Sequence, residues 1–108
     1  REMLQSMLEP KKPRPGRPKG ARTFDPAPAL AFGEAVREKR FELGLSQEEL
    51  ANAAQIERSH MGKIERGEHL PNLVLILRLA KALSVKPGVL VDKAADSLKH
   101  LDVLQKLG

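Results

Sequence analysis

The segment from Gly44 to Leu50 places the strongest constraint on the fold, because it ends one helix and begins another within a few residues. Gly44 follows a helical pattern at the position where a left-handed residue terminates a helix. Ser46 and Glu49 have the spacing of a capping box, and Leu45 can pack on Leu50 as a hydrophobic staple. Since a connection this short brings consecutive helices together, the segment predicts a compact helical unit.

Five helices are predicted between residues 27 and 91, where short helical patterns alternate with helix-breaking signals and no β-branched alternation occurs. Asn72 is the expected cap of the fourth helix, and Pro87 fits the first turn of the fifth. The predicted helices span residues 27–43, 47–54, 57–66, 73–83 and 87–91. The predicted fold class is therefore all-α.

The predicted core lies where these helices meet. In the first helix, the inward residues are Phe32, Val36 and Leu43, and the outward residues are Arg37, Lys39 and Arg40. The seam between the second and third helices is expected to hold Leu50, Ala51, Ala54, Ile56, Met61 and Ile64. In the fourth helix the expected core residues are Leu73, Ile76, Leu77 and Ala80, which leaves Val74 and Leu75 outward.

The basic charge is concentrated at the N-terminal end of the 108-residue chain, which has room for one small domain with tails. Residues 1–30 carry seven basic and three acidic side chains, or +4 of the formal net charge of +5. Six cations, interleaved with Pro and Gly, are Lys11, Lys12, Arg14, Arg17, Lys19 and Arg22. Residues 1–26 are therefore predicted to form a flexible basic arm, which is either a solvated linker or a nucleic-acid-binding strap.

Several classes of protein do not fit the composition. The chain has no Cys, and its three His have no metal-ligand spacing, so neither a metal nor another cofactor is expected. Its longest apolar run, Leu73 to Leu77, is far shorter than the roughly 20 residues of a membrane span. No secretory signal or activated nucleophile is evident, which predicts an intracellular protein that is not an enzyme.

Four blocks of residues, in order along the chain, resemble the Cro and phage-repressor family of helix-turn-helix proteins, also called the XRE family. They are Gly44-Leu45-Ser46-Gln47-Glu48-Glu49-Leu50-Ala51, Ile56, Lys63-Ile64-Glu65-Arg66-Gly67 and Leu77-Arg78-Leu79-Ala80-Lys81-Ala82-Leu83. The resemblance covers about residues 32–91 and implies a compact five-helix lambda-repressor-like DNA-binding domain over residues 27–91. A generic small helical bundle is the alternative.

The resemblance implies a sequence-specific regulator of transcription that binds double-stranded DNA in the bacterial cytoplasm, on the nucleoid. Repression by a homodimer on an inverted repeat is the expected mode. The alternative is an antitoxin or another partner-binding protein that uses the same domain for autoregulation. Its candidate partner-binding segments are the cluster Met3, Leu4, Met7 and Leu8 and the apolar stripe near the C-terminus.

Transfer of the family pattern places the DNA-reading residues on the helix at 57–66. The base-reading residues are Arg58, Ser59, His60 and Lys63, and the phosphate-binding residues are Gln47, Arg66 and, more weakly, Arg40. His60 is alternatively an exposed side chain without a role, and Arg66 alternatively pairs with Glu65 or Glu68. In the arm, Gly16-Arg17-Pro18 resembles part of an AT-hook, although Pro15 stands where that motif has its first Arg.

Three positions depart from the family pattern. Gln55 stands where the turn between the second and third helices usually has Gly, so a slightly different turn is expected. Glu57 replaces the usual Ser or Thr cap of the third helix and is a weaker cap. Gly62, in the middle of that helix, indicates either a close approach of backbone to DNA or simple tolerance.

Residues 92–108 are predicted to form a separate amphipathic helix. Its apolar stripe consists of Ala94, Leu98, Leu101, Leu104 and Leu107, at intervals of three or four residues. The fourth, fifth and C-terminal helices of each protomer are expected to meet in a two-fold dimer interface, which includes Val74, Leu75, Leu98 and Leu101. The alternative is that the helix packs back on its own domain.

Overall fold

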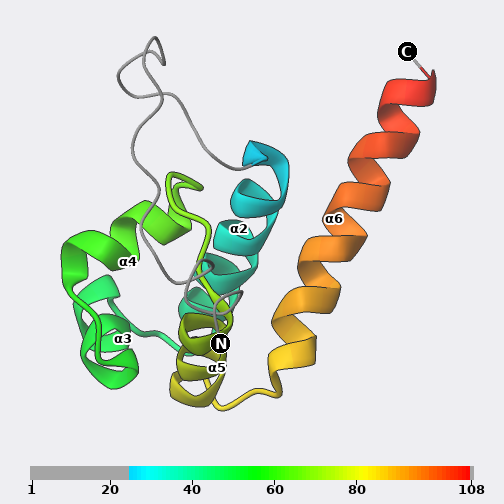
Figure 1. The fold of residues 1–108 in the computed structure, drawn as a ribbon. Coiled ribbons are helices and arrows are strands. Elements are labelled where there is room, and N and C mark those ends of the chain that lie inside the picture. Colours follow the sequence, from blue (N-terminus) through cyan, green and yellow to red (C-terminus); the bar gives the residue numbers. More distant parts are fainter. Residues whose placement is uncertain (1–24, 108) are drawn as a thin grey trace, which may run out of the picture.

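The computed structural model describes residues 25–107, and the side chains up to residue 100. In this part of the chain there are five helices and no strand, which confirms the all-α prediction (Figure 1). The helices are α2 (Pro26–Glu42), α3 (Gln47–Ala54), α4 (Arg58–Glu65), α5 (Leu73–Ala82) and α6 (Pro87–Leu107). None of them is long and apolar enough to cross a membrane.

The predicted caps fix where α3 and α5 begin. Ser46 Oγ accepts a hydrogen bond from the Glu49 amide at 3.0 Å, and Glu49 Oε1 accepts one from the Ser46 amide at 2.9 Å. This bond from the Ser46 amide lowers the pKa of the Glu49 carboxyl. Asn72 Oδ1 accepts from the Leu75 amide at 2.9 Å, whereas Glu57 makes no capping hydrogen bond at the start of α4. Both the strong and the weak caps are therefore as predicted.

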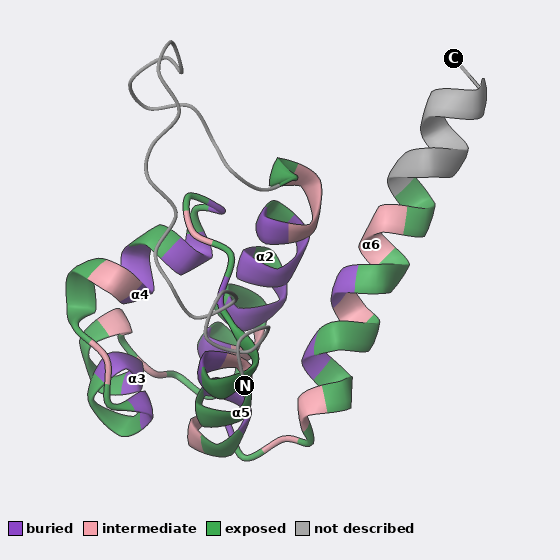
Figure 2. Ribbon diagram, in the orientation of Figure 1, coloured by how far each residue is buried: buried purple, intermediate pink, exposed green. Residues whose placement is uncertain are grey.

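The core joins all five helices, and its centre is the predicted seam between α3 and α4. Leu50, Met61 and Ile64 are fully buried there, and Ala51 and Ala54 are 1% exposed (Figure 2). Phe32 and Val36 of α2 are also buried, as expected. Leu43 was expected in the core but is 46% exposed, because α2 ends at Glu42 and the chain turns away at Gly44.

The α3–α4 turn keeps the left-handed conformation without the usual Gly. Gln55 caps α3 with φ 60° and ψ 44°, so the expectation of a different turn is wrong. The backbone accepts the cost of about 1 kcal/mol because Ile56 donates to Ala51 O at 2.9 Å and packs against the core. Closure of this turn therefore fixes α4 relative to α3.

A glycine that the sequence did not single out lets α4 lie directly on α2. A Cβ atom at Gly33 would overlap the carbonyl oxygen of Ile64 and would come within 2.8 Å of the carbonyl oxygen of Glu65. Any other residue at this position would push the end of α4 away from α2. Gly33 therefore helps to set the distance between α4 and α2.

A buried ion pair also joins α2 to α4. Arg40 Nε donates to Glu65 Oε2 at 2.7 Å, and an Arg40 terminal nitrogen donates to Glu65 Oε1 at 2.9 Å. A third Arg40 nitrogen donates to the Leu45 carbonyl at 2.9 Å. The prediction that Arg40 faces outward and binds a phosphate is wrong, because the residue is 7% exposed and its guanidinium is engaged within the protein.

The phase of α5 differs from the prediction. Leu75 and Leu79 are buried with Ala80, whereas Leu73 is 68% and Leu77 48% exposed. The run from residue 73 to 77 is apolar on every side of the helix, so its periodicity could not indicate which side faces inward.

The two helices predicted after Ser84 are one continuous helix, α6, which begins at Pro87. No Gly or Pro interrupts the chain between residues 89 and 107, so nothing ends the helix at Val91. Leu90 and Ala94 bury one side of its first half against the core (Figure 2). Lys93 lies 3.7 Å from Glu38 and 3.8 Å from Glu42, and these contacts hold α6 along α2.

Candidate nucleic-acid interface

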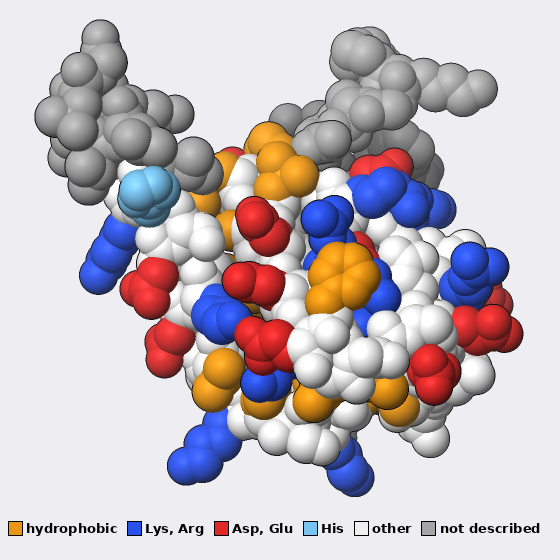
Figure 3. Space-filling model, turned by 180° about the vertical axis from the view of Figure 1, so that it is seen from behind, with side chains coloured by type: hydrophobic (Ala, Val, Ile, Leu, Met, Phe, Trp, Pro, Cys, Tyr) orange, Lys and Arg blue, Asp and Glu red, His pale blue; other side chains and the backbone are white. Residues whose placement is uncertain are grey.

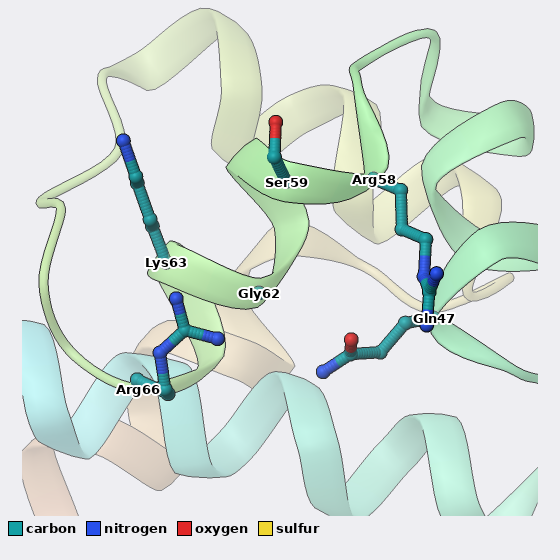
Figure 4. A pocket seen from close by; sticks show the side chains of 6 residues that line it. All are labelled: Gln47, Arg58, Ser59, Gly62, Lys63 and Arg66. Carbon is teal, nitrogen blue, oxygen red and sulfur yellow. The ribbon is translucent and has the colours of Figure 1, made fainter.

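A basic hollow with a volume of about 420 Å³ lies between the start of α3 and the outer face of α4. Its lining consists of Gln47, Arg58, Ser59, Gly62, Lys63 and Arg66 (Figure 4). The structure therefore brings together five of the side chains that the sequence assigned to DNA. No acidic residue lines this hollow among the residues described.

The two sides of the basic hollow carry different groups. Arg58 extends toward the start of α3, where Gln47 lies, whereas Lys63 and Arg66 lie at the opposite end of α4 (Figure 4). Arg58, Ser59 and Lys63 are exposed. The hollow thus offers a planar guanidinium, a hydroxyl and an ammonium group on one helix face, which suits hydrogen bonding to base edges and phosphates.

Gln47 is held in place from below by the buried carboxylate of Glu65. Its Nε2 donates to Glu65 Oε1 at 3.1 Å, and the same oxygen accepts from Arg40. The amides at the start of α3, near the positive end of the helix dipole, lie beside this side chain. Sequence reasoning quoted Glu65 as part of a family block but missed its role, because its partners lie 18 and 25 residues away.

Arg66 pairs with Glu68 in the structure, as the alternative interpretation of the sequence allowed. The pair is open to solvent, with side-chain exposures of 60% and 46%, so little free energy is needed to separate it. A Cβ atom at Gly62 would lie 2.8 Å from an Arg66 terminal nitrogen. Gly62 therefore leaves room for the Arg66 guanidinium against α4, which neither interpretation of this glycine anticipated.

His60 does not line the basic hollow. Its Nε2 lies 3.1 Å from Nδ1 of His69, in the loop after α4, and the two rings meet edge to face at a centroid distance of 4.4 Å. Burial lowers the pKa of His69, and the positive charges of His60 and Lys63 lower it further. Sequence reasoning missed His69, because nothing in the sequence indicates that the loop returns to α4.

The surface over α2 and α6 has a different character. Figure 3 shows acidic and basic side chains interspersed over the face seen from behind. The exposed acidic residues of these helices are Glu34, Glu38, Glu42, Asp92 and Asp96, and Lys39 and Lys93 contact two of their carboxylates. Because charges of both signs are mixed there, the basic hollow is the better site for a polyanion. Within residues 25–107, no three His, Asp or Glu side chains converge in a way that could hold a metal ion.

A second surface is an apolar groove with a volume of about 240 Å³ between α2, α5 and α6. Its lining consists of Pro28, Phe32, Leu70, Pro71, Ile76, Val91, Ala94, Ala95 and Leu98. Leu73 and Leu77 are exposed on the side of α5 that continues from Ile76. These two leucines and the groove together are called the apolar face below.

The apolar face only partly matches the predicted dimer residues. Leu98 lines it, half-buried against the core. Val74 is 53% exposed, so its predicted role in the interface stays a prediction, whereas Leu75, at 8% exposure, belongs to the core and is wrong as an interface residue. The side chains of Leu101, Leu104 and Leu107 lie outside the part of the chain that the structure describes. Residues 1–24, with all six cations of the arm, lie outside it as well.

Comparison with known proteins places this geometry among helix-turn-helix proteins. A family model described as a helix-turn-helix domain matches residues 31–94. An uncharacterized HTH-type transcriptional regulator of Methanothermobacter thermautotrophicus is 46% identical over 48 residues, which are 44% of this chain and 70% of that protein.

Two solved structures match the same region. The restriction-modification controller protein C.AhdI from Aeromonas hydrophila is 45% identical, with a TM-score of 0.58 over 59% of this chain and 97% of that protein. The P22 c2 repressor, solved in complex with a synthetic operator, is 31% identical, with a TM-score of 0.54 over 57% of this chain and 94% of that protein.

Proposed function

Because the chain belongs to the Cro- and phage-repressor-like helix-turn-helix family, we propose that it represses transcription by binding an inverted repeat in double-stranded DNA as a homodimer. The observation that carries this proposal is the basic hollow, where α3 and α4 present three cations and two hydrogen-bonding side chains without an acid. To use this hollow, α4 would enter the major groove of the DNA while the start of α3 contacts the sugar-phosphate backbone.

Base reading is assigned to the first turn and outer side of α4. The exposed Arg58 guanidinium matches the O6 and N7 atoms of guanine, and Ser59 and Lys63 lie next to it on the same face. His60 is left at the edge of this face, so its contribution to base reading is smaller than that of Arg58.

Backbone binding is assigned to both ends of the basic hollow. Gln47, held by Glu65, and the first amides of α3 bind one phosphate. Arg66 exchanges Glu68 for a phosphate, which forms a stronger charge-assisted hydrogen bond once DNA excludes water from the site. The arm, with Arg14 and Arg17 at its centre, adds contacts along the minor groove beyond the domain.

The homodimer is assigned to the apolar face. Leu73 at 68%, Leu77 at 48% and Leu70 at 43% exposure add exposed apolar side chains to the groove, and such a patch is typical of an interaction surface. A second copy of the chain, placed about a two-fold axis, covers both leucine pairs and both grooves. If the protein is instead monomeric, this face fits the alternative of a different protein partner.

Substitution of Arg58 tests the base-reading assignment. Arg58→Ala should weaken binding to the preferred operator by about 1 to 3 kcal/mol and relax the preference at one base pair of each half-site. Arg78→Ala, which removes another exposed Arg, from α5 outside the basic hollow, is the matched control. The measurement is a binding titration on an operator selected from random duplexes and on its single-mismatch variants. An Arg58→Ala protein with the base preference of the wild type would exclude Arg58 as a reading residue.

A further inference from the structure

The two histidines at the edge of the recognition helix form the one pair of histidines in contact among the described residues. His60 stands on α4 beside Lys63, and His69 stands in the loop that leads to α5. With nitrogens 3.1 Å apart, one ring must carry a proton between them and the other must accept it. The contact therefore couples the position of the loop between α4 and α5 to the protonation state of the two imidazoles.

We propose that His60 and His69 act together as a proton-sensitive clamp that increases DNA affinity as the pH falls. This inference rests on the proposed function, because it assumes that phosphates approach the basic hollow. His69 is here the group that takes up the proton, and the ring of His60 holds it against α4. Together the two rings can carry an additional positive charge, and His60 lies three residues before Lys63 on α4.

The charges around the pair determine the sign of the effect. Lys63 is the cation nearest along α4, and it opposes protonation of His69 in the free protein. The acidic groups on the neighbouring elements have other partners or positions. Glu68 pairs with Arg66, Glu49 of α3 belongs to the capping box, and Glu34 of α2 lines a groove toward α6. Glu57 stands at the N-cap position of α4, makes no capping hydrogen bond and is exposed to solvent, which screens its charge. The first turn of α5 contains only apolar residues.

A phosphate placed beside Lys63 reverses this balance. Its negative charge compensates that of Lys63 and favours the protonated pair, so the pKa of His69 is higher in the complex than in the free protein. DNA binding then takes up a proton, and affinity increases as the pH falls below the bound-state value toward the lowered free-state value. Above both values the pair is neutral and contributes no pH dependence.

Operator binding by histidine variants at two pH values tests the clamp. From about pH 7.5 to about pH 5.5, we expect wild-type affinity to rise by about fivefold or more beyond the rise of His69→Gln, because a single coupled proton changes affinity by at most tenfold per pH unit. His60→Gln should lose the same increment. The double variant should lose no more than either single variant, because the rings act as a pair. His100→Gln, which removes the third histidine of the chain on α6, is the matched control and should keep the wild-type pH dependence.

Nuclear magnetic resonance of the imidazole nitrogens in the free protein separates this proposal from the function on which it rests. His60→Gln should raise the pKa of His69, because a positive neighbour is removed, whether or not the protein binds DNA. Failure of all variants to bind any duplex, with this shift intact, would contradict the proposed function. If His69→Gln keeps the wild-type pH dependence of operator binding, or the shift is absent, the clamp is wrong.

Discussion

The α3–α4 face and the apolar face of α5 and α6 have opposite chemistry, although both extend from the same core. The first carries three cations around an open hollow and rests on the buried pair of Arg40 and Glu65. The second carries exposed leucines next to an apolar groove, and only the exposed contacts of Lys93 with α2 and the Asn72 cap add to its packed side chains. The surface that must hold polar groups in fixed positions thus has a buried ion pair as its support, whereas the apolar face has none among the described residues.

This contrast explains why an ion pair is retained inside so small a domain. A buried ion pair seldom adds net stability over apolar residues of the same size, but it can fix one arrangement of polar groups. Here Glu65 binds Arg40 and Gln47 at once, so it joins α2, α3 and α4 directly beneath the basic hollow. We infer that the pair serves the position of Gln47 as much as it serves stability.

The largest expected effect comes from removal of one member of this pair. Glu65→Ala should lower the free energy of unfolding by about 3 to 5 kcal/mol, because the buried Arg40 loses its counter-ion. Glu68→Ala, which removes an exposed partner of Arg66, is the control and should cost less than about 1 kcal/mol. Urea unfolding monitored by circular dichroism measures both changes.

A double substitution separates support of the site from stability. Arg40→Met with Glu65→Leu replaces the pair by apolar residues of similar size, so most of the stability lost in Glu65→Ala should return. Gln47 still lacks its hydrogen bond to Glu65 in this double variant. DNA binding should then remain weakened equally on all duplexes. Recovery of full affinity in this variant would show that Gln47 does not need its bond to Glu65.

The apolar face should fail in a different way. Leu73→Glu with Leu77→Glu should give a folded monomer whose operator affinity is lower by at least about 100-fold, because one half-site provides only part of the specific contact. Val89→Glu, at an exposed valine of α6 that does not line the groove, should remain a dimer. Sedimentation measures the assembly, and a dimeric Leu73/Leu77 variant would place the interface elsewhere.

The salt dependence of DNA binding tests the contribution of the arm, and it distinguishes the basic surfaces from the apolar face. Removal of residues 1–22 should make the log–log salt dependence of binding shallower by about 3.6 if four of the six cations contact phosphates. The apolar face cannot contribute to this slope, because it carries no charge to neutralise. Equal slopes for the full and the truncated protein would identify the arm as a solvated linker.

The polar and apolar faces also differ in how far the sequence predicts them. The capping box, the Asn72 cap and the seam of Leu50, Met61 and Ile64 follow from local spacing, and all were predicted. Local spacing therefore identified the start of α3, whereas the resemblance to the family assigned the outer residues of α4 that meet it at the basic hollow.

The failures share one physical cause, which is dependence on contacts far apart in the chain. Arg40 was misplaced because its partner is 25 residues away, and the His60–His69 pair depends on the path of a loop. The prediction chose the wrong side of α5 as the inner one, because an all-apolar run does not indicate which side faces the core. That side is fixed only by the packing of Leu79 and Leu83. Residue pattern alone could supply none of these three.

The smallest expected effect concerns the turns that join the helices of each face. Gln55 follows α3 with φ 60° and Ser84 follows α5 with φ 57°, so each face contains one non-Gly residue in the left-handed region. Gln55→Gly and Ser84→Gly should each stabilise the fold by roughly 0.5 kcal/mol, because relief of the left-handed strain slightly exceeds the added entropy of the unfolded chain. Gln55→Ala and Ser84→Ala keep the strain and should leave the melting temperature nearly unchanged. Thermal unfolding of the four variants measures the difference, and a loss of stability in either Gly variant would show that its side chain contributes more than its backbone costs.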